Sequence, residues 1–420
     1  MVSSTGTGTS TRRRISHTES NGGTSDRESS STPIDGGEHK KTGTDLIGKK
    51  NEMLLYTIAG VAIALVLLQS GCMSGKDLMA SVKEEFLNRM QVQQQQLQQQ
   101  RGFSACMVTM DDNHLWPEFL AYHYHYLPLR RVIVAVDPLS KTSPSPIFER
   151  YRRHGLMNIT EWSDHDYLSP KAIEKLKSSK LTSHQILKWR QGFLLEACLR
   201  TLRAENRTWV ALIDTDEYII INQHASDQHR IQERKSTVQG MLNSEKNWQH
   251  NNNTPSVCVG MHRLEIGTKE SNASEVQDLV PTGAGLNGSD FLTLRYRWTK
   301  NREHIKPGKC MVDVSRITAK EFSPGNHNPH RPVRSRCSKH EVFRKNSLVP
   351  FIVGHYKGTF EQFSSRDDGR GTRTREAYDK HRHDDATEDS AKFWLQGFID
   401  KVGIKLAKEL LEGSGRVLHG

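Results

Sequence analysis

The chain has 420 residues, of which 59 are Lys or Arg and 48 are Asp or Glu, so its net charge is +11. This length suits one large domain with appendages or two ordinary domains. Only 35% of the residues are hydrophobic, so we expect part of the chain to be unfolded. Six cysteines are too few for a disulfide scaffold, so the fold must depend on an apolar core.

The N-terminal segment, residues 1–52, holds nine Ser, nine Thr and eight Gly and almost no large apolar residues. It cannot offset its chain entropy by burial, so we predict a disordered cytosolic tail. Its charge is nearly balanced, whereas residues 295–383 hold 21 Lys and Arg against nine Asp and Glu. A local basic excess favours a small anionic ligand over nucleic acid, with a plain solvated surface as the alternative.

Residues 53–73 contain no charged side chain and are long enough to cross a bilayer as a helix. A buried core helix, or a signal peptide used from Met53, are the alternatives. Four lysines precede the segment and one follows it closely: Lys40, Lys41, Lys49 and Lys50, then Lys76. The positive-inside rule therefore predicts a signal anchor with type II topology. The short span favours the Golgi or another secretory-pathway membrane.

A Gln-rich stem is predicted for residues 74–101, as a plain spacer or as a site of dimerisation. Everything after the stem would then be lumenal. Five N-glycosylation sequons follow the span and none precedes it: Asn158, Asn206, Asn252, Asn272 and Asn287. Five cysteines also follow it, so at least one is free or pairs between chains. No Cys and His spacing is typical of structural zinc.

From residue 103 onward, patterns of strands and helices alternate. Strands are expected at 103–109, 131–136, 157–162 and 209–213, and helices at 116–126, 147–154 and 187–203. This alternation predicts an α/β domain over residues 102–400, with a mostly parallel sheet between helices, followed by a helix and tail at 401–420. Asp137 and Asp214 each follow a strand, at the edge where such sheets bind ligands. The absence of G-x-G-x-x-G and P-loop motifs disfavours dinucleotide binding and NTP hydrolysis.

The strongest local signal is Asp214-Thr-Asp216-Glu217, which directly follows a buried strand. Two carboxylates one residue apart at this position can converge on one hard divalent cation, which would clamp a diphosphate. Glu217 would then support the ligands or lie at the sheet edge. The alternative is a polar turn in which the Asp residues serve as caps.

This segment resembles the Asp-x-Asp-Glu motif of GT-A glycosyltransferases, most closely glycosyltransferase family 92 and related family 2-like enzymes. Neighbouring motifs agree in order: Glu118-x-x-x-Tyr122-His123, Val134-Ala-Val-Asp137, Arg190-Gln191, Cys198-Leu199, Lys309 with Val312 and His327, and His355-Tyr356. The resemblance covers roughly residues 103–385, with little correspondence between 223 and 287. It implies a GT-A fold, Mn²⁺ dependence, a nucleotide-sugar donor, usually a UDP-sugar, and transfer with inversion.

We expect Asp214, Asp216 and His355 to bind the metal, and an imidazole ligand favours Mn²⁺ over Mg²⁺. We expect four side chains to bind the donor: Asp137, Arg190, Lys357 and Arg366. Lys357 lies in a Gly-rich turn after an expected strand at 349–353, and the basic run that follows is either a lid over the diphosphate or a solvated loop. Inversion needs a carboxylate base, and the candidates are Glu361, Asp367, Asp368 and Asp290, with Glu361 first.

The sequence thus favours a type II membrane glycosyltransferase that moves a sugar onto a hydroxyl of a glycan or glycoconjugate. One alternative is a non-catalytic lumenal protein that binds carbohydrate or acts as a scaffold. Another is a sulfotransferase using a 3′-phosphorylated adenylyl sulfate, but its phosphate loop should follow the first strand. Strict dependence on a divalent metal would separate these classes. The predicted topology disfavours a nucleic-acid partner.

Overall fold

The computed structural model describes residues 83–85, 102–222, 257–300, 306–322, 328–330, 332–333, 336–337, 351–365 and 373–416. The chain divides into two compact units, Met1–Glu85 and Phe86–Gly420. In the first unit only a helical segment at residues 83–85 is described. No helix of the described residues is long and apolar enough to span a bilayer. The predicted tail and the membrane segment at 53–73 lie outside those residues, so both stay predictions.

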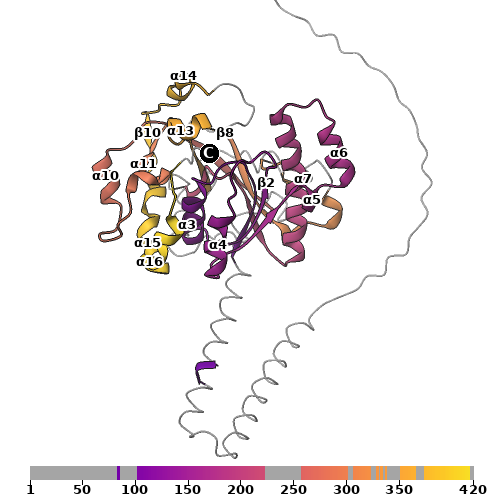
Figure 1. Ribbon diagram of the computed structural model, residues 1–420, viewed down its shortest axis with the longest axis horizontal. Coiled ribbons are helices and arrows are strands. Elements are labelled where there is room, and N and C mark those ends of the chain that lie inside the picture. The colour runs from indigo at the N-terminus through magenta and orange to yellow at the C-terminus, as the bar shows by residue number, and fades with distance from the viewer. Residues whose placement is uncertain are drawn as a thin grey trace, which may run out of the picture. The chain divides into compact units, whose positions relative to one another are not determined.

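Four of the ten strands in the sheet of the second unit form a parallel part, as expected from the alternation of strands and helices (Figure 1). Its strands, in spatial order, are β3 (Asn158–Trp162), β2 (Leu129–Val136), β1 (Phe103–Thr109) and β4 (Trp209–Leu212). Side chains alternate along β1: Ala105 and Met107 enter one core cluster and Cys106 enters the other. The carboxyl ends of all four strands lie at one edge, where ligands bind in sheets of this kind.

The remaining six strands correct the expectation of a mostly parallel arrangement. Its strands are β5 (Glu217–Ile221), β6 (Cys258–Ile266), β7 (Trp298–Thr299), β8 (Lys306–Asp313), β9 (Phe351–Tyr356) and β10 (Ala386–Thr387). Antiparallel pairing joins β8 to β4, β6 to β8, β7 to β6, β10 to β7 and β5 to β9, and only β9 is parallel to β6. The turn from β4 to β5 is too short for the crossover that parallel neighbours need, so β5 pairs with the distant β9.

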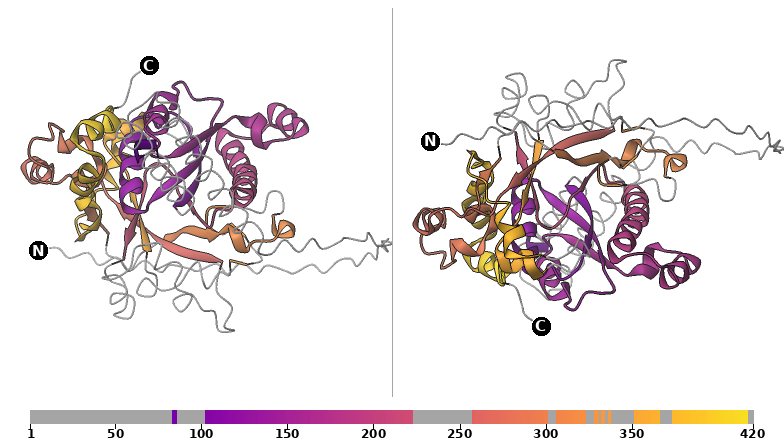
Figure 2. Two further views of the ribbon diagram at one scale, coloured as in Figure 1. Left: turned by 90° about the horizontal axis from the view of Figure 1, so that it is seen from below. Right: turned by 90° about the horizontal axis from the view of Figure 1, so that it is seen from above.

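Helices cover both faces of the sheet, as predicted. The longer ones are α3 (Trp116–Tyr126), α4 (Ser145–Arg153), α6 (Pro170–Lys177), α7 (Ser183–Ala204), α15 (Trp394–Val402) and α16 (Ile404–Leu411). The short ones are α5 (Asp164–Tyr167), α10 (Ala273–Asp278), α11 (Leu292–Arg295), α13 (Phe360–Ser365) and α14 (Arg375–Asp379). Helices α3, α15 and α16 share one core cluster, and α7 packs in the other. Figure 2 shows α7, in magenta, across the sheet from α15 and α16, in yellow.

The predicted helices are confirmed, and the largest difference is at the start of α7. The helix begins at Ser183, four residues before the start of the helix predicted at 187–203. Thr182 and Gln185 form a capping box, in which each side chain accepts a hydrogen bond from the other residue's backbone N–H. The polar first turn therefore belongs to the helix, although it lacks the apolar residues from which the rest of the helix was predicted.

Two disulfides link segments that are distant in sequence, Cys106 to Cys198 and Cys258 to Cys337. Cys310 is buried and lies outside both disulfides, which accounts for the odd number of cysteines after residue 73. The described sequon asparagines, Asn158, Asn206, Asn272 and Asn287, are all exposed, whereas Asn252 lies outside the described residues. Their exposure is compatible with glycan attachment.

Candidate functional site

The turn that carries the Asp pair is held at both ends by hydrogen bonds. The backbone N–H of Glu217 donates to the Asp214 carbonyl at 3.1 Å, and the Asp214 N–H donates to Glu217 Oε2 at 3.0 Å. The Tyr356 N–H donates to the Asp216 carbonyl at 2.9 Å, and the Thr215 hydroxyl donates to Asp112 Oδ2 at 3.0 Å. The chain from β4 to β5 therefore presents its two Asp side chains from a fixed backbone.

Two of the three predicted metal ligands meet at this turn. His355 Nε2 lies 3.4 Å from Asp216 Oδ2, and both side chains are largely buried. Neighbouring ligands around a small divalent cation lie about 3 Å apart, given metal–oxygen distances of about 2.0–2.1 Å. The spacing of this carboxylate and imidazole therefore fits a shared cation.

The third predicted ligand, Asp214, points elsewhere. Its carboxylate is about half exposed, and its Oδ2 lies 2.7 Å from the ammonium of Lys309. The structure thus brings Asp216 and His355 together, while Asp214 forms an ion pair with Lys309. The sequence analysis named Lys309 only as part of the family resemblance and gave it no role. The long separation of Lys309 from the Asp pair in sequence gave no local signal for this contact.

Lys309 also contacts Glu217, and both side chains are almost completely buried, with 3.1 Å between Nζ and Oε2. Burial raises the pKa of Glu217 to about 7, against the opposing charge of Lys309. Burial alone would lower the pKa of Lys309, but the carboxylates of Asp214 and Glu217 outweigh it and raise that pKa. Lys309 therefore supplies a permanent positive charge beneath the Asp turn.

The Glu-x-x-x-Tyr-His motif of α3 holds the neighbouring backbone in place. The Tyr122 hydroxyl donates to the Ile219 carbonyl at 2.8 Å, and the Ile219 N–H donates to His123 Nε2 at 3.3 Å. The other ring nitrogen of His123 lies 2.9 Å from the Phe119 carbonyl, so the ring accepts at Nε2 and donates at Nδ1. Burial lowers the pKa of His123 to about 3, which keeps the ring neutral for both bonds.

Glu118, the first residue of that motif, binds the N-terminal end of α11. Its carboxylate accepts hydrogen bonds from the backbone N–H groups of Leu292 and Thr293, at 2.7 and 2.9 Å, and from the Thr293 hydroxyl at 2.7 Å. Burial raises the pKa of Glu118 to about 7, although the bonds from Thr293 and Leu292 oppose this. The motif therefore supports the architecture around the Asp turn through backbone contacts.

A cavity of about 780 Å³ opens at the carboxyl ends of the parallel strands. Its wall includes Met110 after β1, Asp137 after β2 and Asp164 after β3. Two predicted donor-binding residues meet here: Arg190 of α7 lies 3.2 Å from Asp137 Oδ2 and 2.8 Å from Asp164 Oδ2. Asp164 was missed from the sequence, although it follows the strand at 158–162 as Asp137 follows β2. The volume is large enough for a nucleoside.

The remaining predicted residues have different surroundings. Lys357 lies 3.0 Å from Glu265 Oε1, an acidic partner that the sequence analysis did not identify. Asp290 accepts from the Asn287 side chain at 3.1 Å within a 3₁₀ turn at Gly288–Asp290. Arg366, Asp367, Asp368, Asn252 and His327 lie outside the described residues.

Glu361, the first candidate for the base, lines a separate cavity of about 530 Å³ together with Arg295 and Tyr378. Its pKa is lowered by hydrogen bonds from its own backbone N–H and from the Thr359 side chain. The carboxylate is therefore ionised at neutral pH and able to accept a proton. The cavity is lined by segments that follow β6 and β9, together with residues of α11 and α14 and Arg382, and β9 is the strand that carries His355.

Known proteins resemble this chain only distantly. No family model matches the sequence, and no curated protein matches it. Solved structures of S. aureus TarS residues 1–349 match at low similarity. The one in complex with UDP is 14% identical over 42% of this chain and 39% of its own, with a TM-score of 0.22. The other is 12% identical over 61% of this chain and 59% of its own, with a TM-score of 0.25.

Proposed function

We propose that the chain is a metal-dependent glycosyltransferase that moves a sugar from a nucleotide-sugar donor, preferably a UDP-sugar, to a hydroxyl of a glycan or glycoconjugate. One observation carries this proposal: Asp216 and His355 meet 3.4 Å apart just beyond the carboxyl end of β4. The 780 Å³ cavity opens at the same edge of the sheet. A carboxylate and an imidazole able to hold a metal, at the same edge of the sheet as a nucleoside-sized cavity, would suit a donor that carries a nucleoside and a diphosphate.

Each group at the site has a part in this proposal. Asp216 and His355 would hold Mn²⁺, and Asp214 would join them or orient a ligand through its contact with Lys309. The bound ion would supply positive charge to the diphosphate as it leaves. Lys309 fixes the Asp turn electrostatically from below. Lys357, one residue after Tyr356, and Arg366 would add positive charge to the phosphates.

The wall of the cavity is suited to fixing the nucleoside. Asp137 and Arg190 hold each other in place through their ion pair, and Asp164 braces the guanidinium from the other side. A carboxylate held in this way can accept hydrogen bonds from a ribose or base without first losing side-chain freedom. Binding the nucleoside at this wall would direct the diphosphate toward the Asp turn.

We propose transfer by single displacement with inversion. In this reaction a carboxylate takes the proton of the acceptor hydroxyl as its oxygen bonds to the anomeric carbon and the bond to the diphosphate breaks. Glu361 is the first candidate, because its carboxylate is ionised and faces a cavity large enough for part of an acceptor. Asp367, Asp368 and Asp290 are the other candidates.

We also propose that the protein is a single-pass type II membrane protein of the Golgi or another secretory-pathway compartment, with this unit in the lumen. Two disulfides and four exposed sequon asparagines support an oxidising, glycosylating compartment. Endoglycosidase treatment of the protein from cells should increase its electrophoretic mobility. Unchanged mobility would count against a lumenal unit.

The catalytic proposal is tested with the full-length protein purified in a mild detergent. Its hydrolysis of UDP- and GDP-sugars is measured in Mn²⁺ and in a chelator, first without and then with glycan acceptors. We expect one donor to be cleaved only in the presence of the metal, and Asp216→Asn to abolish cleavage. A protein that binds glycans but cleaves no nucleotide sugar would instead be the non-catalytic carbohydrate-binding protein considered above.

A further inference from the structure

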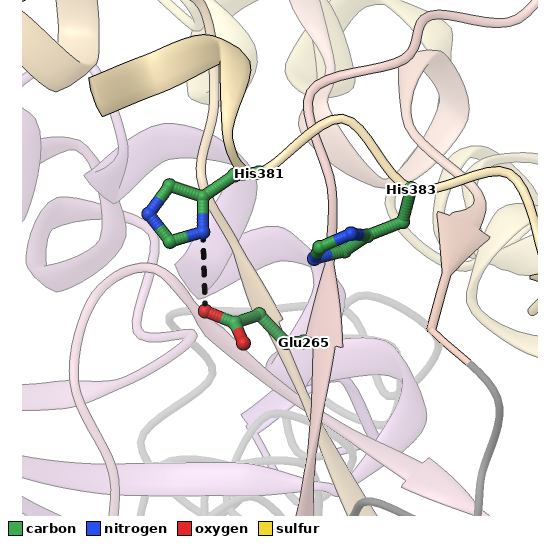
Figure 3. A group of neighbouring side chains, drawn as sticks. All are labelled: Glu265, His381 and His383. Carbon is green, nitrogen blue, oxygen red and sulfur yellow. Dashed lines mark ion pairs between the residues drawn. The ribbon is translucent and has the colours of Figure 1, made fainter. Parts of the chain in front are cut away.

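A second group of potential metal ligands lies at the end of β6, where Glu265 pairs in register with His355 of the neighbouring strand β9. Glu265, His381 and His383 place one ligand atom each within 4.8 Å of the others, and they are the one such group of three found among the described residues. His381 Nδ1 lies 3.5 Å from Glu265 Oε1. Figure 3 shows the two imidazole rings extending from one loop toward the same carboxylate.

The backbone holds this loop directly against the end of β6. The Thr268 N–H donates to the His381 carbonyl at 3.0 Å. A Cβ added to Gly267 would lie 2.4 Å from that carbonyl oxygen and 3.0 Å from the ring of His383. The approach of the loop therefore depends on glycine at this position, and the three side chains meet through fixed backbone contacts.

His383 gives an independent reason to expect a ligand. The residue is 4% exposed, and its Nε2 has no hydrogen-bond partner among the described residues. Buried polar atoms in proteins are nearly always paired with protein, water or an ion. A metal ion between His383 and Glu265 would supply the missing partner.

We propose that Glu265, His381 and His383 form a second cation site, distinct from the one at Asp216 and His355 and suited to Zn²⁺. Two imidazoles and one carboxylate form a ligand set typical of zinc with one open position. Zinc–ligand distances of about 2.0–2.2 Å place neighbouring ligand atoms about 3.4 Å apart, and the three ligand atoms already lie within 4.8 Å of one another. This site has two imidazoles where the Asp turn has one, so it is the softer of the two and the better suited to zinc.

One nearby charge opposes the ion. The ammonium of Lys357 lies 3.0 Å from Glu265 Oε1, so a cation at this site competes with Lys357 for the carboxylate. Zinc binding would release Lys357 from Glu265 and join the loop at residues 381–383 firmly to β6. That loop follows α14, whose Tyr378 and Asp379 line the 530 Å³ cavity, so the ion would also fix one wall of that cavity.

The test uses Zn²⁺ as the probe and the full-length protein, purified in detergent and stripped by a chelator. Zinc affinity is measured by competition with a chromogenic chelator, and the site geometry by the visible absorption of Co²⁺ bound in its place. We expect Glu265→Gln, His381→Gln and His383→Gln each to weaken zinc binding at least roughly tenfold and to remove the tetrahedral Co²⁺ spectrum. We expect Lys357→Met to strengthen it.

His154→Gln is the matched control, because His154 Nε2 also faces a glutamate, Glu409, at 3.2 Å but without a second imidazole in the cluster. It should bind zinc as the wild type does. The same variants are also made in an Asp216→Asn background, so that zinc bound at the Asp turn does not enter the comparison. Thermal unfolding in chelator confirms that each variant folds. His381 is partly exposed, so its variant keeps the test valid if His383→Gln is unstable. Wild-type affinity in both Glu265→Gln and His381→Gln would overturn the proposal, whatever the outcome for nucleotide sugars.

Discussion

Two clusters in this protein use the same residue types, carboxylates with a lysine and histidine, but differ in burial. At the Asp turn, the side chains of Glu217 and Lys309 are 0% and 3% exposed. At the end of β6, those of Glu265 and Lys357 are 12% and 14% exposed. Separating a fully buried ion pair leaves each charge without a partner or water, so such a pair does not readily exchange partners. A partly exposed pair keeps some hydration and exchanges partners more readily. The first cluster is thus a fixed support, and the second can release its lysine to another cation.

The largest expected effect comes from removing the lysine of each cluster. Lys309→Met leaves the Glu217 carboxylate buried without its cation and should lower the free energy of unfolding by about 3–5 kcal/mol. Lys357→Met, the matched change at the hydrated cluster, should cost no more than about 1–2 kcal/mol. Chemical denaturation of the full-length variants measures both. Equal losses would show that burial does not distinguish the clusters.

A buried group with no ionic partner should instead be sensitive to pH. Because the pKa of His123 is about 3 in the folded protein and about 6.5 in unfolded chains, only the unfolded state takes up a proton between these values. Stability is therefore lost as the pH falls through this window. His123→Gln removes this proton uptake by the unfolded state. The difference in the free energy of unfolding between the wild type and the variant should therefore shrink by about 2 kcal/mol from pH 6.5 to pH 5.

Glu118 acts in the opposite direction. Its pKa is about 7 in the folded protein, above its pKa in unfolded chains, so the free energy of unfolding falls as the pH rises between these two pKa values. The wild-type profile alone therefore mixes two opposing contributions. Denaturation of the wild type and His123→Gln at several pH values isolates the histidine. A difference independent of pH would mean that His123 is solvated or charged in the folded state.

The smallest expected effect concerns the turn itself. Thr215 is buried, and its hydroxyl donates to Asp112 at 3.0 Å. Thr215→Val keeps the shape but removes this bond, at a cost of about 1 kcal/mol. The midpoint of denaturation should fall slightly, with the metal ligands still in place. A loss as large as that of Lys309→Met would indicate that the turn depends on this hydrogen bond more than on the buried lysine.

The two halves of the sheet differ in how much the sequence predicts. Strands β1 to β4 follow one another in sequence with helices between them, so their apolar runs predicted this part of the sheet. Asp137 and Asp214 could therefore be placed at the edge of the sheet. β5 pairs with β9, whose residues lie 130 or more positions later, and no local pattern encodes such a partner. His355 was therefore placed only through the family resemblance, not through residue spacing.

The contacts that matter most to the site were the least predictable. Lys309 reaches Asp214 because β8 pairs with β4, and the Glu265 carboxylate faces His381 because a glycine lets two distant segments touch. Neither the His-x-His pair at 381 and 383 nor the lone Glu265 has the sequence spacing of a structural zinc site. Ligands bind at the carboxyl ends of parallel strands, so polar residues that follow each strand are candidates for the site. Applying this rule to the strand at 158–162 as well would have found Asp164.

The central claim is that Asp216 and His355 hold a divalent cation that binds a nucleotide-sugar donor. Calorimetric titration of UDP-sugars into the full-length protein, with and without Mn²⁺, tests it most directly. The matched variants are Asp216→Asn and Asp278→Asn, the latter an exposed aspartate at the end of α10. We expect metal-dependent binding in the wild type and Asp278→Asn, weakened at least roughly tenfold in Asp216→Asn. Equal, metal-independent binding in all three proteins would contradict it.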